Sequence, residues 1–189
     1  MAGNRDRQIK ALIILADGFE EVETVTPIDV LRRADIEVLV SGLAKKVVTG
    51  SHGVVLTTDV LLKDIQDLPD AIIIPGGPGA EELGRSPQVR EWVRKVGSAN
   101  KIVSAICAAP AAVLAPAGVL EGKKATCFPG YENRLAAGGA VFSPDRVVVD
   151  GPIITSRGAG TAMEFSLELV RALAGPEKAS EISAQILAS

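Results

Sequence analysis

The sequence predicts an α/β protein with a mostly parallel central sheet and helices on both faces. Apolar, β-rich runs alternate with helical patterns from one end of the chain to the other, which is the order that produces such a sheet. The 189 residues are 47% hydrophobic, 23% charged and only 3% aromatic, so we expect a globular core built from Val, Ile, Leu and Ala. No internal repeat or low-complexity linker interrupts the pattern, and we therefore expect one domain over residues 1–189.

In the first half, strands are expected at compact apolar runs and helices where apolar residues recur at helical spacing. In order, these are a strand at Lys10–Leu15, a helix at Val22–Ala34, a strand at Ile36–Ser41, extended segments at Val54–Thr57 and Asp59–Leu62, a central strand at Asp70–Ile74, and helices at Ala80–Gly84 and Gln88–Val96. The central strand stops at Pro75-Gly76-Gly77, so its C-terminal end should open into a glycine loop.

In the second half, a buried strand and a helix follow each other without a connecting loop. The expected elements are a strand at Ile102–Ile106, a small-residue helix at Ala108–Ala115, a short helix at Tyr131–Ala136 within an irregular region, strands at Arg146–Val149 and Ile153–Thr155, and helices at Thr161–Ala174 and Glu177–Leu187. Gly175-Pro176 is the expected stop between the last two helices.

Charge, cysteine and histidine counts exclude several classes of partner. The net charge is −3, with Lys and Arg scattered, so no basic stripe is available to bind nucleic acid. The first apolar run, Ala11–Ala16, is too short for a signal peptide or a membrane span, and we expect a cytoplasmic protein. Two cysteines make no disulfide framework, and a single histidine without a Cys-x-x-Cys motif leaves almost nothing to bind zinc. We therefore expect a thiol enzyme with no cofactor and no metal.

Cys107 stands where the buried strand turns directly into a helix, which is the setting of a nucleophile elbow. Such a turn needs small residues two positions before and after the nucleophile, and Ala105 and Ala109 meet that need. A helix N-terminus stabilises a thiolate, so we expect the pKa of Cys107 to lie well below the free value of about 8.5. The alternative is that Cys107 is a small buried core residue.

The glycine loop 75–79 follows another apolar strand, so its backbone N–H groups can point toward the sheet edge where Cys107 lies. We expect Gly76 and Gly77 to form an oxyanion hole. A dinucleotide fingerprint is a poor alternative, because the loop lacks the third glycine and does not belong to the first βα unit. A simple tight turn is the other alternative.

Glu23 lies at the start of the first helix, again at the C-terminal edge of the sheet, where its side chain can face Cys107. A carboxylate would repel a thiolate, so Glu23 would have to stay protonated and donate a hydrogen bond to sulfur. Glu20 and Glu21 are expected to be solvated partners of the helix dipole. His52 is in a polar loop and would have to cross to the sheet edge to form a Cys-His dyad, and Cys127 is expected to be structural.

Four motifs together resemble the ThiJ/PfpI superfamily over essentially the whole chain. They are Glu23-Thr24, Pro75-Gly76-Gly77, the run from Ala105 to Pro110 and the run from Thr155 to Thr161. The resemblance implies a flavodoxin-like sandwich, a homodimer, a reactive cysteine on an elbow and a protonated glutamate bonded to it. It also implies that Ala108 supplies a further backbone N–H.

The resemblance places further residues near the pocket. Glu20 matches an acidic residue close to the site, Arg33 and Arg157 match arginines near the pocket or the dimer contact, and His52 falls where relatives often carry an arginine that reaches the partner subunit. At two positions this chain differs from other branches of the superfamily. The protease-like branch has histidine where this chain has Ala108, and animal members have a pocket histidine where it has Phe128. A Cys-His-acid peptidase is therefore not expected.

The resemblance implies an enzyme that converts small dicarbonyls, methylglyoxal or glyoxal, to lactate or glycolate without glutathione or metal and so limits glycation. Cys107 would attack the aldehyde, and Glu23 or water would move the proton between the adjacent carbons. The alternative from a different class is a redox sensor or holdase chaperone in which the same cysteine is oxidised.

Overall fold

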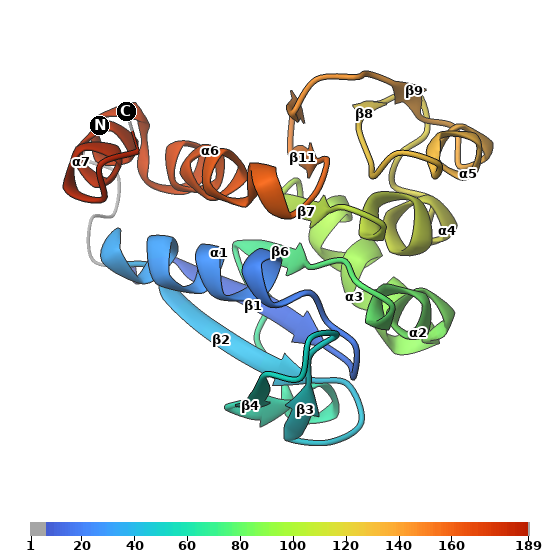
Figure 1. Ribbon diagram of the computed structural model, residues 1–189, viewed down its shortest axis with the longest axis horizontal. Coiled ribbons are helices and arrows are strands. Elements are labelled where there is room, and N and C mark those ends of the chain that lie inside the picture. The colour runs from blue at the N-terminus through green and yellow to red at the C-terminus, as the bar shows by residue number, and fades with distance from the viewer. Residues whose placement is uncertain (1–6, 189) are drawn as a thin grey trace.

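The computed structural model describes residues 7–188, and its central sheet has seven strands (Figure 1). Residues 1–6 and 189, which the expected domain includes, lie outside the described residues. The strand order is β10-β11-β7-β6-β1-β2-β5, and all neighbours are parallel except β10 and β11. The strands are β1 (Lys10–Leu15), β2 (Glu37–Gly42), β5 (Val60–Leu61), β6 (Ala71–Ile74), β7 (Ile102–Ile106), β10 (Val147–Asp150) and β11 (Ile153–Ser156). The predicted fold class is confirmed.

Helices cover both faces of this sheet (Figure 1). One layer contains α1 (Glu21–Arg33), α6 (Ala162–Ala174) and α7 (Pro176–Gln185), and the other contains α2 (Gly79–Arg85), α3 (Pro87–Ser98) and α4 (Ala115–Ala117). Successive residues of β1 point to opposite layers: Leu12 and Ile14 pack with the second layer, and Ile13 and Leu15 with the first. Both faces are buried, which explains why the strands are continuous apolar runs in the sequence.

The expected extended segment Val54–Thr57 contains β4 (Val55–Thr57). Several other short elements were not expected from the sequence: β3 (Val47–Thr49), which pairs with β4, the strand pair β8 (Lys124–Ala125) and β9 (Val141–Phe142), and 3-10 turns at Leu62–Asp64 and Ala159–Thr161. The expected helix Ala108–Ala115 is instead a π-helical turn over Pro110–Leu114 that continues into α4. The short helix α5 (Glu132–Ala137) lies where it was expected.

The sheet brings three loops to one edge. β1 pairs with β2 on one side and with β6 on the other, so the strand order changes direction at β1 and β6. Loops that follow the carboxyl ends of strands on the two sides of such a point diverge and leave room for a ligand. Glu23, Gly76 and Cys107 follow β1, β6 and β7 respectively, so all three lie at this edge. Within residues 7–188, no helix has the length and apolar character needed to cross a membrane.

The layer behind the elbow depends on a close approach between α2 and the π-helical turn. A methyl group on Gly84 of α2 would press against the carbonyl oxygen of Ala112, whereas a methyl group on Gly97 of α3 would make ordinary contacts at 3.5 and 3.6 Å. We expect Gly84→Ala to lower the free energy of unfolding by roughly 1–3 kcal/mol through overpacking. Gly97→Ala should be neutral or stabilising by up to about 1 kcal/mol, because alanine favours helix. Urea unfolding of both variants tests this, and equal effects would contradict it.

Candidate active site

Cys107 has a left-handed backbone at the point where β7 ends. Its φ is 65°, a conformation that non-glycine residues adopt rarely and that costs energy unless the surroundings enforce it. Its N–H donates to the carbonyl oxygen of Ser156 at 2.9 Å, and its own carbonyl accepts the N–H of Phe128 at 2.8 Å. The backbone of Cys107 is therefore fixed on both sides, as in a nucleophile elbow.

Glu23 is buried in the first turn of α1 and points into the protein. Only 1% of the residue is exposed. The helix starts here because Glu20 is the N-cap: its Oε2 accepts the N–H of Glu23 at 2.7 Å. Oε2 of Glu23 accepts the N–H of Gly76 at 2.8 Å, whereas Oε1 is buried without a hydrogen-bond partner among the described residues.

Gly76 lies between the acid and the thiol. A methyl group in place of its hydrogen would lie 2.6 Å from Cβ of Cys107, 2.6 Å from Oε2 of Glu23 and 3.0 Å from Sγ of Cys107. These distances are too short for any side chain, so glycine is required for the two functional groups to face each other. The Glu23 carboxyl group and the Cys107 thiol are close enough to share a hydrogen bond.

Burial controls the protonation of this pair. It raises the pKa of Glu23 to about 7, and the charge of Glu20 adds to this, while the hydrogen bonds from Gly76 and Cys107 lower it. Burial, followed by the charge of Glu23, raises the pKa of Cys107 to about 12, against the lowering effect of the N–H groups of Gly77 and Ala108. The expectation of a low thiol pKa is therefore not met while Glu23 is ionised. A thiolate can form readily only if the carboxyl group keeps its proton.

The backbone donors are arranged differently from the expected oxyanion hole. The N–H groups of Gly77 and Ala108 lie near enough to the sulfur of Cys107 to lower the pKa of the thiol. Gly76 departs from the prediction, because its N–H is already bonded to Glu23 and is not free for an oxyanion. The backbone donors near the sulfur are therefore those of Gly77 and Ala108 rather than the glycine pair.

Glu20, Glu21 and His52 form a separate group at the rim. Each offers one ligand atom within 4.8 Å of the others, so this group has the residue types of a metal site. However, Glu21 already accepts the N–H of His52 at 2.6 Å and contacts Nδ1 of His52 at 3.0 Å. Its carboxylate holds the 50–54 loop against the start of α1, a role that the sequence reasoning missed. His52 is 74% exposed in its side chain and makes no contact with Cys107.

The remaining residues suggested by the resemblance lie at different distances from the thiol. Phe128 is half-exposed, and its ring packs against Gly158 beside Glu23. Arg157 lies further out, with its guanidinium over the ring of Phe142 and bonded to the carbonyl of Pro144. Arg33 is paired with Asp29 in the last turn of α1, ten residues or about 15 Å along the helix from Glu23. The structure does not bring Arg33 to the site within one chain.

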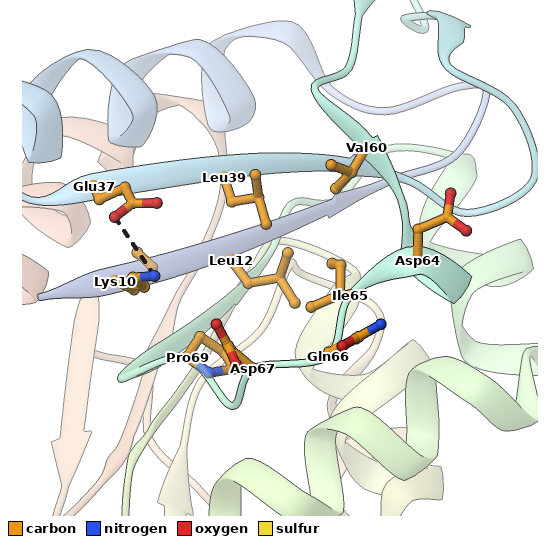
Figure 2. Close-up of a pocket in the computed structure, with 11 residues that line it drawn as sticks. Lys10, Leu12, Glu37, Leu39, Val60, Asp64, Ile65, Gln66, Asp67 and Pro69 are labelled. Carbon is orange, nitrogen blue, oxygen red and sulfur yellow. Dashed lines mark ion pairs between the residues drawn. The ribbon is translucent and has the colours of Figure 1, made fainter.

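A cavity of about 290 Å³ opens elsewhere, at the start of β1 and β2 (Figure 2). Leu12, Leu39 and Ile65 form an apolar floor, and Asp64 and Asp67 lie at its rim. None of the predicted site residues lines it. We therefore place the candidate active site at the carboxyl edge of the sheet and not in this cavity.

The fold and site define an α/β protein that has a cysteine on a strand-to-helix elbow and a buried glutamate beside it. The model of the DJ-1/PfpI family matches residues 9–172, and the chain belongs to that family. Parkinson disease protein 7 homolog of Danio rerio is 43% identical over 99% of this chain and 98% of its own length. The structure of Drosophila melanogaster DJ-1beta superposes with a TM-score of 0.90 at 40% identity, over 96% of this chain and 98% of that one.

Other relatives extend the comparison. Glutathione-independent glyoxalase DJR-1.2 of Caenorhabditis elegans is 37% identical over 93% of this chain and 94% of its own length, so the family includes a protein named as an enzyme. Protein DJ-1 homolog A of Arabidopsis thaliana is 44% identical over 93% of this chain, but the match covers only 46% of that longer protein.

The raised pKa of Glu23 predicts a specific pH dependence of stability. Because the folded-state pKa of about 7 exceeds the ordinary value of 4.5, the native state holds a proton that the unfolded state releases first. The stability that Glu23 contributes is therefore fully present below about pH 4.5 and falls by about 3 kcal/mol as the pH rises through 7. Glu23→Gln removes this loss, so we expect its unfolding free energy, relative to the parent, to rise by about 3 kcal/mol between about pH 4 and about pH 8.

Glu21→Gln is the matched control with the opposite sign. Burial alone would raise the pKa of Glu21, but hydrogen bonds from the side chain and backbone of His52 lower it to about 2. The stability that Glu21 contributes is fully present above its ordinary pKa of 4.5 and disappears as the pH falls through 2. Glu21→Gln should therefore destabilise near neutral pH and less in acid. If urea unfolding gave both variants the same pH trend, the assignment of a protonated Glu23 would be wrong.

Proposed function

We propose that this protein converts small 2-oxoaldehydes such as methylglyoxal and glyoxal to lactate and glycolate, with Cys107 as nucleophile and Glu23 as its acid partner. The observation that supports it best is the position of Glu23: a buried carboxyl group with a pKa of about 7, separated from the thiol only by Gly76. A group with such a pKa can both donate and accept a proton near neutral pH. The relative named glutathione-independent glyoxalase supports the same activity.

The proposed reaction starts with the Cys107 thiolate and protonated Glu23. Sulfur adds to the aldehyde carbon, the carbonyl electron pair moves to oxygen, and Glu23 protonates that oxygen to give a hemithioacetal. Glu23, now a carboxylate, takes the proton from the former aldehyde carbon, and the electrons move to the adjacent carbonyl oxygen to give an enediolate. The hydroxyl proton on the first carbon moves to the enediolate oxygen, and Glu23 returns its proton to the second carbon, which gives a thioester. One water molecule then cleaves the thioester, releasing lactate and the thiol.

The backbone around Cys107 suits the charged intermediates. The N–H groups of Gly77 and Ala108 act on the sulfur, so we expect them to stabilise an oxygen that becomes negative on the attached carbon. No described side chain provides a strong base beside the thiol, since His52 is bonded to Glu21 at the rim. An aldehyde is electrophilic enough for a thiolate to capture without such a base, whereas an amide is not. This difference favours a dicarbonyl substrate over a peptide.

A redox sensor or holdase remains the second proposal, because Cys107 is partly accessible whereas Cys127 is buried. Thiolate character and access decide which cysteine is oxidised. The two proposals differ in stoichiometry: an enzyme turns over, and a sensor reacts once per thiol.

We expect the purified protein to form lactate from methylglyoxal over many turnovers with no added glutathione, metal or nucleotide. Cys107→Ser should lower the rate by about a thousandfold or more, since a serine hydroxyl has no base to activate it here. Cys127→Ala, which changes the buried cysteine of the same chain, should retain most of the activity. Enzymatic lactate assays with and without chelator measure this.

The result that would overturn the enzyme proposal is a parent protein that forms no lactate, or a Cys107→Ser variant that forms it at the parental rate. A single stoichiometric loss of methylglyoxal per thiol would instead support the second proposal.

We also propose that the protein is a homodimer. Five exposed valines lie on α1 and on the β3–β4 hairpin, namely Val22, Val25, Val47, Val54 and Val55. Glu21 joins the two elements by accepting N–H groups from the hairpin loop, so the valines belong to one connected region. An exposed apolar region of this kind usually marks an interface with another protein. Because most soluble oligomers are symmetric homo-oligomers, we expect a second copy of the same chain to cover it.

Light scattering at micromolar concentration should therefore give the mass of a dimer. Val55→Lys places a charge in the proposed contact and should weaken dimerisation by about tenfold or more. Val149→Lys is the matched control, because Val149 is similarly exposed (52% against 58%) but lies on β10, outside this region. A monomeric parent, or equal weakening by both lysines, would contradict the proposed interface.

A further inference from the structure

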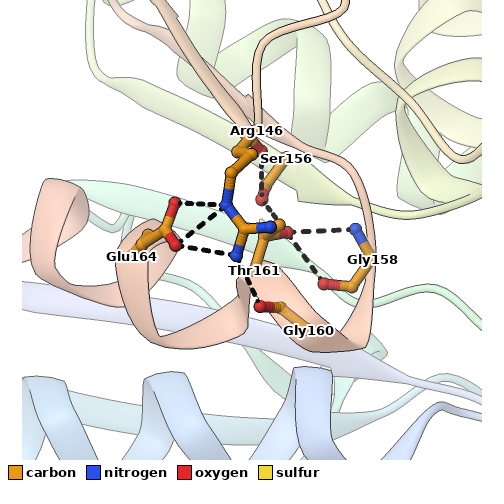
Figure 3. Close-up of polar contacts among 6 residues, drawn as sticks. All are labelled: Arg146, Ser156, Gly158, Gly160, Thr161 and Glu164. Atoms are coloured by element: carbon orange, nitrogen blue, oxygen red, sulfur yellow. Dashed lines mark hydrogen bonds and ion pairs between the residues drawn. The ribbon is translucent and has the colours of Figure 1, made fainter. Parts of the chain in front are cut away.

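Two buried hydroxyl groups lie behind the elbow, on the segment that links β11 to α6 (Figure 3). Oγ of Ser156 is 2.6 Å from Oγ1 of Thr161. Oγ of Ser156 also donates to the carbonyl of Arg146 at 2.9 Å, and Oγ1 of Thr161 accepts the N–H of Gly158 at 3.1 Å. Polar groups buried in this way are held in place by their partners, so the pair fixes the conformation of residues 156–161.

Each hydroxyl carries one proton, and two assignments satisfy the whole cluster. In one, Ser156 donates to the carbonyl of Arg146 and Thr161 donates to Ser156; in the other, Ser156 donates to Thr161, and Thr161 donates to the carbonyl of Gly158 at 2.8 Å. In either case the remaining carbonyl still accepts a backbone N–H, and the N–H of Gly158 donates to the Thr161 hydroxyl. The N–H of Gly158 is therefore committed to Thr161.

The same segment touches both members of the reactive pair. The carbonyl oxygen of Ser156 accepts the N–H of Cys107 and so supports its left-handed backbone. Gly158 lies beside the acid: a methyl group on it would be 3.3 Å from the ring of Phe128 and 4.0 Å from Oε1 of Glu23. Gly158 thus lies against the carboxyl oxygen that has no partner among the described residues.

An ion pair holds the outer side of the segment. The guanidinium of Arg146 contacts both carboxylate oxygens of Glu164 at 2.7–3.0 Å, and its Nη2 donates to the carbonyl of Gly160 at 2.9 Å (Figure 3). This contact is solvent-exposed and contributes little by itself. Gly158 itself is held on the inner side, by the hydroxyl and the backbone N–H of Thr161.

We propose that Thr161 is a positioning residue for the Cys107–Glu23 pair: its hydroxyl holds Gly158 and Ser156 so that the acid stays covered and the elbow stays fixed. Thr161 acts through these neighbours and does not contact a substrate. The proposal concerns the reactivity of the thiol, so it can be tested whether or not the protein turns over a dicarbonyl.

Loss of the Thr161 hydroxyl should change how the pair shares its protons. With Gly158 released, water reaches Oε1 of Glu23, and a hydrated carboxyl group ionises more easily. The single negative charge of the pair then lies on the carboxylate in a larger share of molecules, so the fraction with a thiolate and a protonated carboxyl group falls.

The test is the pH dependence of Cys107 alkylation by iodoacetamide in the full chain, comparing the parent with Thr161→Val and Thr161→Ser. Valine has nearly the shape of threonine without the hydroxyl. We expect its alkylation to rise at a lower pH than in the parent and to reach a plateau that is roughly five- to tenfold lower, the effect of about one hydrogen bond. Thr161→Ser keeps the hydroxyl and should behave like the parent.

Thr58→Val is the matched control for removing a buried threonine hydroxyl. Thr58 is 2% exposed, and its hydroxyl bonds to the carbonyl of Val60 at 3.2 Å, away from the site. This variant should lower the thermal midpoint without moving the alkylation profile. If Thr161→Val is too unstable to measure, Ser156→Ala should give the same two changes.

The proposal fails if folded Thr161→Val, or Ser156→Ala in its place, has the parental profile, or if Thr161→Ser is as impaired as the valine variant. Lactate formation is measured separately in the same samples. A shifted alkylation profile in a protein whose parent forms no lactate would refute the dicarbonyl function while supporting the role of Thr161.

Discussion

The contact between a buried acid and a thiol across Gly76 is the constraint on which the rest of the site depends. Any side chain at this position would lie within 3.0 Å of both groups, so the glycine loop is required by packing as well as by turn geometry. The loop also supplies the N–H that binds Glu23. The parallel sheet makes the contact possible, because β1, β6 and β7 are joined only through parallel pairings and end at one edge.

Much of the fold followed from the sequence because the sheet is buried on both sides. Apolar runs such as Ile102–Ile106 are then unambiguous, and the positions of Cys107 and Glu23 after two such runs place them at one edge. The short strands β3, β8 and β9 were missed, since two or three residues give no readable periodicity. Thr161 was predicted only as the end of a family motif and the start of a helix, because the role we propose for it depends on a contact with Ser156 that local pattern does not encode.

The error about the thiol pKa has a physical cause. The argument from the helix N-terminus considered only the favourable N–H groups, and those of Gly77 and Ala108 do lower the pKa of Cys107. Burial and the neighbouring carboxylate act in the opposite direction and are larger. The protonation of the thiol is therefore a property of the pair: a thiolate forms readily only in molecules whose carboxyl group keeps its proton.

Helix α1 connects this chemistry to the proposed dimer. Its buried side carries Glu23, while Val22 and Val25 face outward, so one helix contributes to both the site and the exposed apolar region. Glu21 stands between them and holds the hairpin loop with four hydrogen bonds from Ser51, His52 and Val54. A second copy covering these valines would restrict the movement of α1 and of the loop at the rim. In our proposal, Glu23 keeps its proton only while it is covered. Restraint of α1 by a second copy would therefore favour a reactive Cys107, as the proposed restraint of Gly158 by Thr161 does.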